Sequence, residues 1–337
     1  MSTSVGKTRP VVVVAILAGL VIALAYLVES RGDSGAVHVY DGTAHDLPFL
    51  WQRLVAPIAT GFPSADNERV YLSTAEPQQL LALGALSGDE SWGLDLRLGY
   101  TGIRQIIADG TSVYALNATR LTAYEASTGR QEWSTRLGDG HVRAILEDAG
   151  DALLAYYGGD LIRVSKLSGA VVDRRLIGRL LWVTPVADVH EVDGGMIGID
   201  PASGVVLWRT SSVPFMVSED RKPQSAGSAR LLVYVETERL CMLDVQTGLY
   251  AWCAERPFVS NAVVDPSQER VYVLDEDYTL LSLDIASGDS EIIASFPFSE
   301  LVRDSASYHY ALSASADRLF LYFGDTTQLF ALAINPG

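Results

Sequence analysis

The sequence predicts an all-β fold of repeated antiparallel sheets, and three observations support this prediction. One short phrase, with a turn glycine at its centre, recurs six times along the chain, and successive turn glycines are 35 to 44 residues apart. Short runs rich in β-branched and aromatic residues, a composition typical of strands, precede the phrases. A period near 40 residues with strand-like content is typical of propeller blades, each a four-stranded antiparallel sheet.

The clearest copy of the phrase predicts a strand, a tight turn and a second strand. It reads LCMLDVQTGLYAW and covers residues 240–252. Asp244 can accept hydrogen bonds from backbone amides two residues further on. Gly248 supplies the positive φ that such a loop needs, after which the chain returns towards Trp252.

The other copies share this organisation. Three clear copies read LALGALSGDESW, LTAYEASTGRQEW and IDPASGVVLW, at residues 81–92, 121–133 and 199–208. Weaker copies cover residues 161–169 and 281–288. Each turn glycine follows a Ser or Thr, and these glycines are Gly88, Gly129, Gly169, Gly204, Gly248 and Gly288. Four of them have Trp four residues later, whereas the weaker copies have Asp173 and Ile292 at that position.

Two strand-like runs before each phrase complete a sheet of four strands. Residues 103–109 and 112–116 precede the second phrase, and residues 261–265 and 270–274 precede the sixth. Asp, Gly, Pro and Asn bound these runs, and such residues favour turns. A helical solenoid of similar period would have apolar residues at helical spacing, which these runs lack. In the fifth repeat, the polar residues 218–229 are predicted to form a long loop.

The two ends of the repeat region predict one composite blade. Residues 49–54 resemble the last strand of a blade but lack the three strands before it. Residues 318–324 and 329–334 supply middle strands without a last one. Pairing of the two fragments would close the ring and leave no free sheet edge at the junction. Six phrases and this composite blade predict a seven-bladed β-propeller.

The pattern Leu-x-x-Leu-Asp-x-x-Thr-Gly-x-x-x-Trp in residues 240–252 resembles the repeat of the PQQ-like (quinoprotein alcohol dehydrogenase-like) propellers. The resemblance covers roughly residues 50–337. That superfamily includes quinoprotein alcohol dehydrogenases and the propeller lipoprotein of the bacterial outer-membrane assembly machine. The resemblance therefore implies the fold, and it leaves enzymes and scaffolds open as functions.

The tryptophans of the repeat have two interpretations. They could form a surface on which carbohydrate stacks, but their fixed place in the repeat favours packing between neighbouring blades. These blade-docking residues are Trp51, Trp92, Trp133, Trp208 and Trp252. Trp182 is out of phase with the repeat, and its role is left open.

The N-terminal residues predict a membrane anchor. Residues 1–10 are polar and basic, and residues 11–28 form an unbroken apolar run that is just long enough to span a bilayer. A cleaved signal peptide is the alternative, but the run exceeds the usual apolar core of one. Lys7 and Arg9 precede the run, which predicts a cytoplasmic N-terminus and an exported propeller. Residues 29–36 read as a linker, and residues 37–337 as the propeller.

The charge of the chain limits its partners. The formal net charge is −16 at pH 7, and only three charged residues, Lys7, Arg9 and Glu29, lie in the first 30. Such an acidic surface repels nucleic acid and anionic headgroups, and favours solubility or a basic partner.

Two cysteines, Cys241 and Cys253, lie in the fifth phrase. If the hairpin pairs Asp244 with Tyr250, the cysteines stand directly opposite each other, at a separation that suits a disulfide. Export to an oxidising compartment favours the disulfide over two buried thiols.

The sequence offers no catalytic, cofactor-binding or metal-binding residues. The five histidines are scattered, and neither a nucleophile elbow nor a phosphate loop is present. Among the proteins that the chain resembles, the PQQ-dependent dehydrogenases have eight blades, longer chains and two adjacent cysteines. This chain has seven predicted blades and 337 residues, and its cysteines are twelve residues apart. We therefore expect a non-catalytic, membrane-anchored interaction subunit without cofactors, whose partners are membrane or envelope proteins and not nucleic acid. The alternatives are a PQQ-dependent dehydrogenase and a small-ligand sensor.

Overall fold

The computed structural model describes residues 49–334, except 57, 59–62, 97–101, 139–143, 158–159, 177–179, 212–222, 236–238, 255, 266, 268, 297–309, 316 and 325–326. The predicted cytoplasmic segment, membrane helix and linker (1–10, 11–28 and 29–36) and the predicted start of the propeller at residue 37 lie outside the described residues. Within the described part, the structure contains no helix long and apolar enough to cross a membrane.

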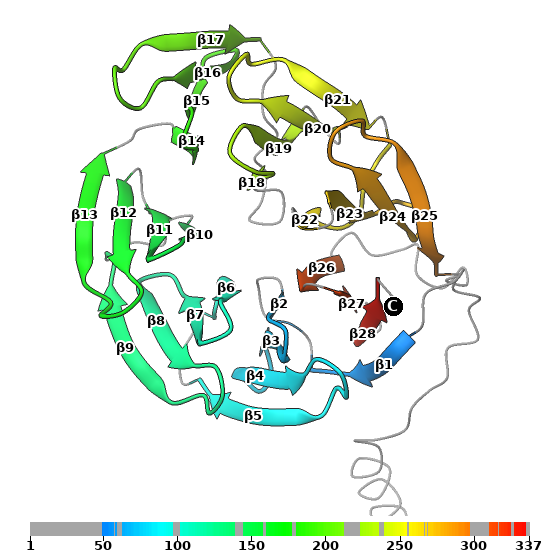
Figure 1. The fold of residues 1–337 in the computed structure, drawn as a ribbon. Coiled ribbons are helices and arrows are strands. Elements are labelled where there is room, and N and C mark those ends of the chain that lie inside the picture. Colours follow the sequence, from blue (N-terminus) through cyan, green and yellow to red (C-terminus); the bar gives the residue numbers. More distant parts are fainter. Residues whose placement is uncertain are drawn as a thin grey trace, which may run out of the picture. The chain divides into compact units, whose positions relative to one another are not determined.

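The described residues form seven four-stranded antiparallel sheets arranged around a centre, so the predicted seven-bladed β-propeller is confirmed (Figure 1). In blades 1 to 6 the strands follow chain order from the innermost to the outermost. Blade 1 comprises β2 (Ser64–Ala65), β3 (Arg69–Thr74), β4 (Gln79–Gly84) and β5 (Glu90–Asp95). Blade 2 comprises β6 (Gln105–Ala108), β7 (Ser112–Leu116), β8 (Arg120–Glu125) and β9 (Gln131–Arg136). Blade 3 comprises β10 (Ala144–Ala149), β11 (Ala152–Tyr157), β12 (Asp160–Ser165) and β13 (Val171–Leu176).

The remaining blades repeat this order. Blade 4 comprises β14 (Leu180–Val183), β15 (Asp188–Val192), β16 (Gly195–Ile199) and β17 (Val206–Thr210). Blade 5 comprises β18 (Gln224–Ser225), β19 (Arg230–Val235), β20 (Arg239–Asp244) and β21 (Tyr250–Ala254). Blade 6 comprises β22 (Val263–Asp265), β23 (Arg270–Leu274), β24 (Thr279–Asp284) and β25 (Ser290–Ser295). Blade 7 comprises β26 (Tyr310–Ser315), β27 (Arg318–Phe323), β28 (Gln328–Ala333) and, as its outermost strand, β1 (Phe49–Leu54).

Strand β1 closes the ring, as the sequence predicted. It pairs antiparallel with β28, and Trp51 lies opposite Ala331 while Arg53 lies opposite Leu329. The first described strand therefore completes the sheet that the last three described strands begin. This pairing covers the edge of β28 and gives blade 7 the four strands of the other blades.

The core lies between the sheets and not within a single sheet. The second strands β7 and β19 are buried on both faces and are correspondingly rich in Val, Leu and Tyr, whereas β15 of blade 4 is only partly buried. Outermost strands such as β5 are mostly exposed, with a buried Trp92. Buried clusters join neighbouring blades, for example Leu232 and Met242 of blade 5 with Val271 and Leu283 of blade 6.

The predicted loop at residues 218–229 is wrong in one part. Gln224 and Ser225 form β18, the innermost strand of blade 5, and they pair with Leu232 and Leu231. The strand is only two residues long and polar, so neither length nor hydrophobic alternation distinguishes it from a loop.

Candidate functional site

The turn of each repeat is fixed by its own side chains. In blade 5, Asp244 Oδ1 accepts hydrogen bonds from the backbone amides of Gln246 (2.9 Å) and Thr247 (3.0 Å). The amide of Gly248 then donates to the carbonyl oxygen of Asp244 at 2.8 Å, and Gly248 has a φ of +71°. Asp200 makes the same bonds in blade 4, where the backbone amide of Ser203 is the main cause of its lowered pKa. The predicted hydrogen bond, donated to Asp244 by the backbone amide two residues further on, is confirmed.

The six turn glycines share one conformation, with φ between +69° and +76°. At five of them a second constraint applies, because an indole from the preceding blade lies against the glycine. A Cβ on Gly248 would come within 2.5 Å of Trp208, and one on Gly288 within 2.6 Å of Trp252. A side chain at these positions would therefore displace the indole.

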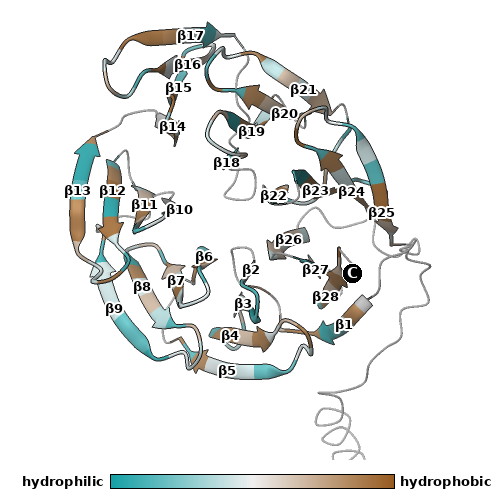
Figure 2. Cartoon of the chain, viewed as in Figure 1, coloured by the Kyte–Doolittle hydropathy of each residue, from teal (hydrophilic) through white to brown (hydrophobic). Residues whose placement is uncertain are grey.

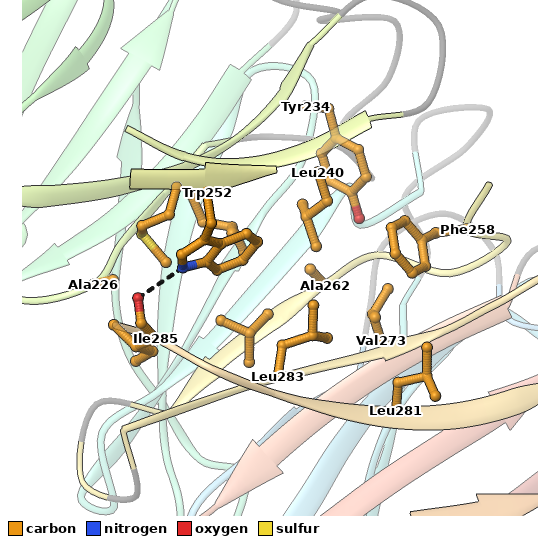
Figure 3. Close-up of a cluster of buried hydrophobic side chains, with 13 residues drawn as sticks. Ala226, Tyr234, Leu240, Trp252, Phe258, Ala262, Val273, Leu281, Leu283 and Ile285 are labelled. Carbon is orange, nitrogen blue, oxygen red and sulfur yellow. Dashed lines mark hydrogen bonds between the residues drawn. The ribbon is translucent and has the colours of Figure 1, made fainter. Parts of the chain in front are cut away.

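Each of these indoles also donates a hydrogen bond from Nε1 to the carbonyl oxygen three residues before the glycine. Figure 3 shows one case, in which Trp252 donates to Ile285 at 2.9 Å within the cluster between blades 5 and 6. The five bonds, at 2.7–2.9 Å, are Trp51 to Ala85, Trp92 to Ala126, Trp133 to Lys166, Trp208 to Val245 and Trp252 to Ile285. The five tryptophans of the repeat therefore each dock their own blade on the next.

Nearer the centre, side-chain amides join neighbouring blades, which the sequence did not predict. Gln105 Nε2 donates to the carbonyl oxygen of Leu146 at 2.7 Å, and its Oε1 accepts from the amide of Leu146 at 2.8 Å. Asn261 binds both backbone groups of Leu312 in the same way, at 3.0 and 2.7 Å. Gln224 bonds the carbonyl oxygen of Ala262 and accepts from the amide of Val264. Each of these side-chain amides bonds backbone groups of the neighbouring blade in the way that a paired strand would. A Gln or Asn at or just before the start of an innermost strand is the sequence feature from which these contacts could have been predicted.

Comparison with known proteins shows the family of this chain. The family model described as "Outer membrane protein assembly factor BamB" matches residues 33–193 and 192–291. The chain belongs to this family. The crystal structure of BamB from Moraxella catarrhalis is similar with a TM-score of 0.48 and 16% identity, over 82% of this chain and 84% of that one. No curated protein matches the sequence significantly.

Two boundaries of this BamB-family propeller lack the docking tryptophan: blade 6 has Ile292 in its place, and the boundary after blade 3 is the other case. Asp173 of blade 3 stands where the other docking blades have Trp, and β13 is exposed along its whole length. Instead, Tyr156 and Trp182 stack between blades 3 and 4, with ring centroids 5.5 Å apart and planes at 11°. Trp182, whose role the sequence left open, also donates from Nε1 to Ser225 Oγ at 3.0 Å. Trp182 therefore packs between blades 3, 4 and 5.

A charged cluster joins blades 2 and 3. Lys166 Nζ lies 3.0 Å from Asp109 Oδ2 and 2.8 Å from Asp148 Oδ2, and 5.6 Å from the ring centroid of Tyr114. Burial disfavours the charged forms, but the amide of Ser112 and the ammonium of Lys166 hold the pKa of Asp109 well below its usual range. Burial likewise disfavours the charged amine, but bonds to Asp148 and Asp109 raise the pKa of Lys166. Asp109 and Lys166 are therefore charged at neutral pH, and their ion pair is an ionic clamp between blades 2 and 3.

Cys241 of β20 and Cys253 of β21 form a disulfide, and Cys241 is fully buried. The register assumed for the hairpin was wrong, because Tyr250 pairs with Leu243 and not with Asp244. A bulge then adds one residue to β21, so that Trp252 lies opposite Met242 and Cys253 opposite Cys241. The bulge thus restores the pairing that the two cysteines need.

The described residues include no group of three or more His, Cys, Asp or Glu side chains that could hold a metal ion. Of the predicted site residues, all six turn glycines, all five docking tryptophans and both cysteines lie in described strands and turns. The structure brings these residues together at blade boundaries and within one hairpin, on elements that build the ring. The surface that a partner would contact must therefore be sought on the rim and the loops.

Proposed function

We propose that this chain is a non-catalytic interaction subunit of an envelope complex that assembles outer-membrane proteins. The observation that carries the proposal is the match of the BamB family model to residues 33–193 and 192–291. The architecture supports it, since the docking contacts of the ring stiffen a disc whose rim and loops stay free for a partner. A rigid surface loses little conformational entropy on binding, which suits a scaffold.

We further propose that residues 11–28 anchor the propeller in a membrane, with residues 1–10 in the cytoplasm and the propeller outside it. This topology would keep the disc close to envelope and integral-membrane partners. Protease added to intact spheroplasts should digest the propeller. Digestion only after the membrane is breached would contradict the topology.

Affinity purification of the full chain after mild detergent solubilisation tests the function. The expected result is co-purification, in defined stoichiometry, of subunits that assemble outer-membrane proteins. A monodisperse chain without partners that takes up PQQ and Ca²⁺ and reduces a dye with an alcohol would contradict the proposal and favour a dehydrogenase.

A further inference from the structure

The boundary between blades 3 and 4 contains half of the docking contact found at five other boundaries. The receiving half is complete, since Gly204 has a φ of +71° and its amide donates to the carbonyl oxygen of Asp200 at 2.8 Å. The corresponding bond of Gly248 has the same length. Among the residues that the structure describes, apart from Gly204 and its two neighbours in the chain, no atom lies within 4 Å of the place that a Cβ would take on Gly204. The turn has the geometry that receives an indole elsewhere, and it is open.

The missing half is the indole itself. Asp173 lies opposite Arg163, directly after a bulge, as Trp133 lies opposite Ala123 after the equivalent bulge of blade 2. Asp173 therefore occupies the register of a docking tryptophan. Its short, charged side chain supplies neither the apolar ring face nor the N–H donor of an indole.

The outer surface around this open turn is apolar. In blades 1, 2 and 6 the three residues after the turn glycine are charged or polar, whereas blade 4 has Val205, Val206 and Leu207 there. Val205 is 59% exposed, and Val172 and Leu176 on β13 are 57% and 83% exposed. Figure 2 shows hydrophobic stretches on both β13 and β17 at the outer rim. Apolar side chains gathered at the surface in this way mark interaction sites.

The charged residues at the boundary indicate which charge a partner would carry beside the apolar side chain that it places there. Arg174 and Arg175 are both exposed on β13, in a chain whose net charge is −16. Arg174 Nη2 donates to the carbonyl oxygen of Leu137 in blade 2, so its guanidinium lies at the boundary with blade 2 and not with blade 4. Arg175 is the exposed guanidinium that remains, and beside an apolar surface it complements a carboxylate next to an apolar residue of a partner.

We propose that a partner protein inserts a tryptophan side chain, flanked by an acidic residue, at the boundary between blades 3 and 4. The indole lies across Gly204 and donates its N–H to the carbonyl oxygen of Pro201, as Trp208 lies across Gly248 and donates to Val245. A carboxylate of the partner, beside the tryptophan, pairs with Arg175. This inference rests on the proposed function, because it names the surface and the partner chemistry of that interaction subunit.

Photo-crosslinking of the full chain in cells tests the proposal. A benzoylphenylalanine replaces Val172 or Leu207, on the two sides of the boundary, in separate variants. The control position is Leu86, which is 66% exposed at the turn of blade 1, where Trp51 already fills the slot. We expect both boundary positions to crosslink to the same protein, through a peptide that contains Trp with Asp or Glu beside it, and no such adduct from position 86.

Asp173→Trp is the decisive variant, because its own indole should then cover the turn at Gly204 and leave no room for the tryptophan of a partner. We expect it to raise the thermal midpoint of the propeller and to lower the adduct yield at least tenfold. Ile292→Trp, which places an indole at the same repeat position of blade 6, should leave the adduct unchanged. If Asp173→Trp does not fold, Val172→Glu should give the same loss of adduct, read from the benzoylphenylalanine at position 207.

The outcomes separate this inference from the proposed function. An adduct that persists in Asp173→Trp and in Val172→Glu, or a crosslinked peptide without Trp, overturns the inference. Co-purification of envelope subunits without any boundary adduct also overturns it and leaves the proposed function standing. Absence of both adduct and co-purifying subunits contradicts the proposed function and the inference together.

Discussion

The indole N–H of Trp252 donates a hydrogen bond to the carbonyl oxygen of Ile285, 33 residues further along the chain and one blade further around the ring. This contact, repeated at five boundaries, means that each blade depends on its neighbour. Disruption of one boundary should therefore lower the stability of the whole propeller.

Trp252→Ala should destabilise the propeller by about 3–5 kcal/mol, because it removes a buried indole and leaves the Ile285 carbonyl without this donor. Denaturant unfolding of the full chain measures the change. Ile292→Ala is the matched control, since Ile292 has the same place in the repeat of blade 6 but is 56% exposed. The control should cost less than about 1 kcal/mol. Equal losses in the two variants would show that the boundary contact contributes nothing.

Gln105→Leu should cost about 2–4 kcal/mol, because it leaves the amide and the carbonyl of Leu146 without their partners in a buried place. The control is Gln79→Leu, whose amide bonds Asp95 at 2.8 Å on the exposed surface and should matter little. Hydrogen exchange at the amide of Leu146 gives a second measurement. Unchanged protection of this amide in Gln105→Leu would contradict the two hydrogen bonds by which Gln105 of β6 holds Leu146 of β10.

Asp109→Asn should lower stability by about 1–2 kcal/mol at pH 7, because it removes one charge partner of Lys166. The folded pKa of Asp109 lies below its unfolded value of about 3.9, so its contribution is present above that pH and is lost as the pH falls through the folded value. The difference between the original chain and Asp109→Asn should accordingly shrink below about pH 4. Unfolding curves at several pH values check this. A difference that grows on acidification would refute the assignment.

The disulfide should survive purification and contribute about 2–3 kcal/mol, since it closes a short loop with a sequence separation of 12. Mass spectrometry after alkylation in denaturant should show two modified cysteines only when a reductant is added. Alkylation of Cys241 and Cys253 without reductant would disprove the bond in the native protein. The double variant Cys241→Ala/Cys253→Ala, measured by denaturant unfolding, gives the free-energy contribution.

The sequence by itself determined the number of blades, the position of each turn and the closure of the ring by residues 49–54. These features follow from local rules, because each turn has Ser or Thr followed by Gly at a regular spacing and a strand shows its burial within a few residues. The two-residue strand β18 was missed because a segment that short carries no periodic signal.

Only the tertiary structure decided which polar atoms meet across the blades. Gln105 and Leu146 are 41 residues apart, and whether an amide there faces solvent or a neighbouring strand depends on how two sheets pack. The bulge that aligns Cys241 with Cys253 is likewise a property of the paired strands. The sequence did show Asp173 in place of a tryptophan, but the consequence, an open turn at Gly204 beside an apolar rim, exists only once blades 3 and 4 stand next to each other. Contacts between blades form across distances in sequence at which no local pattern constrains them, because the geometry of packing, and not chain spacing, brings them together.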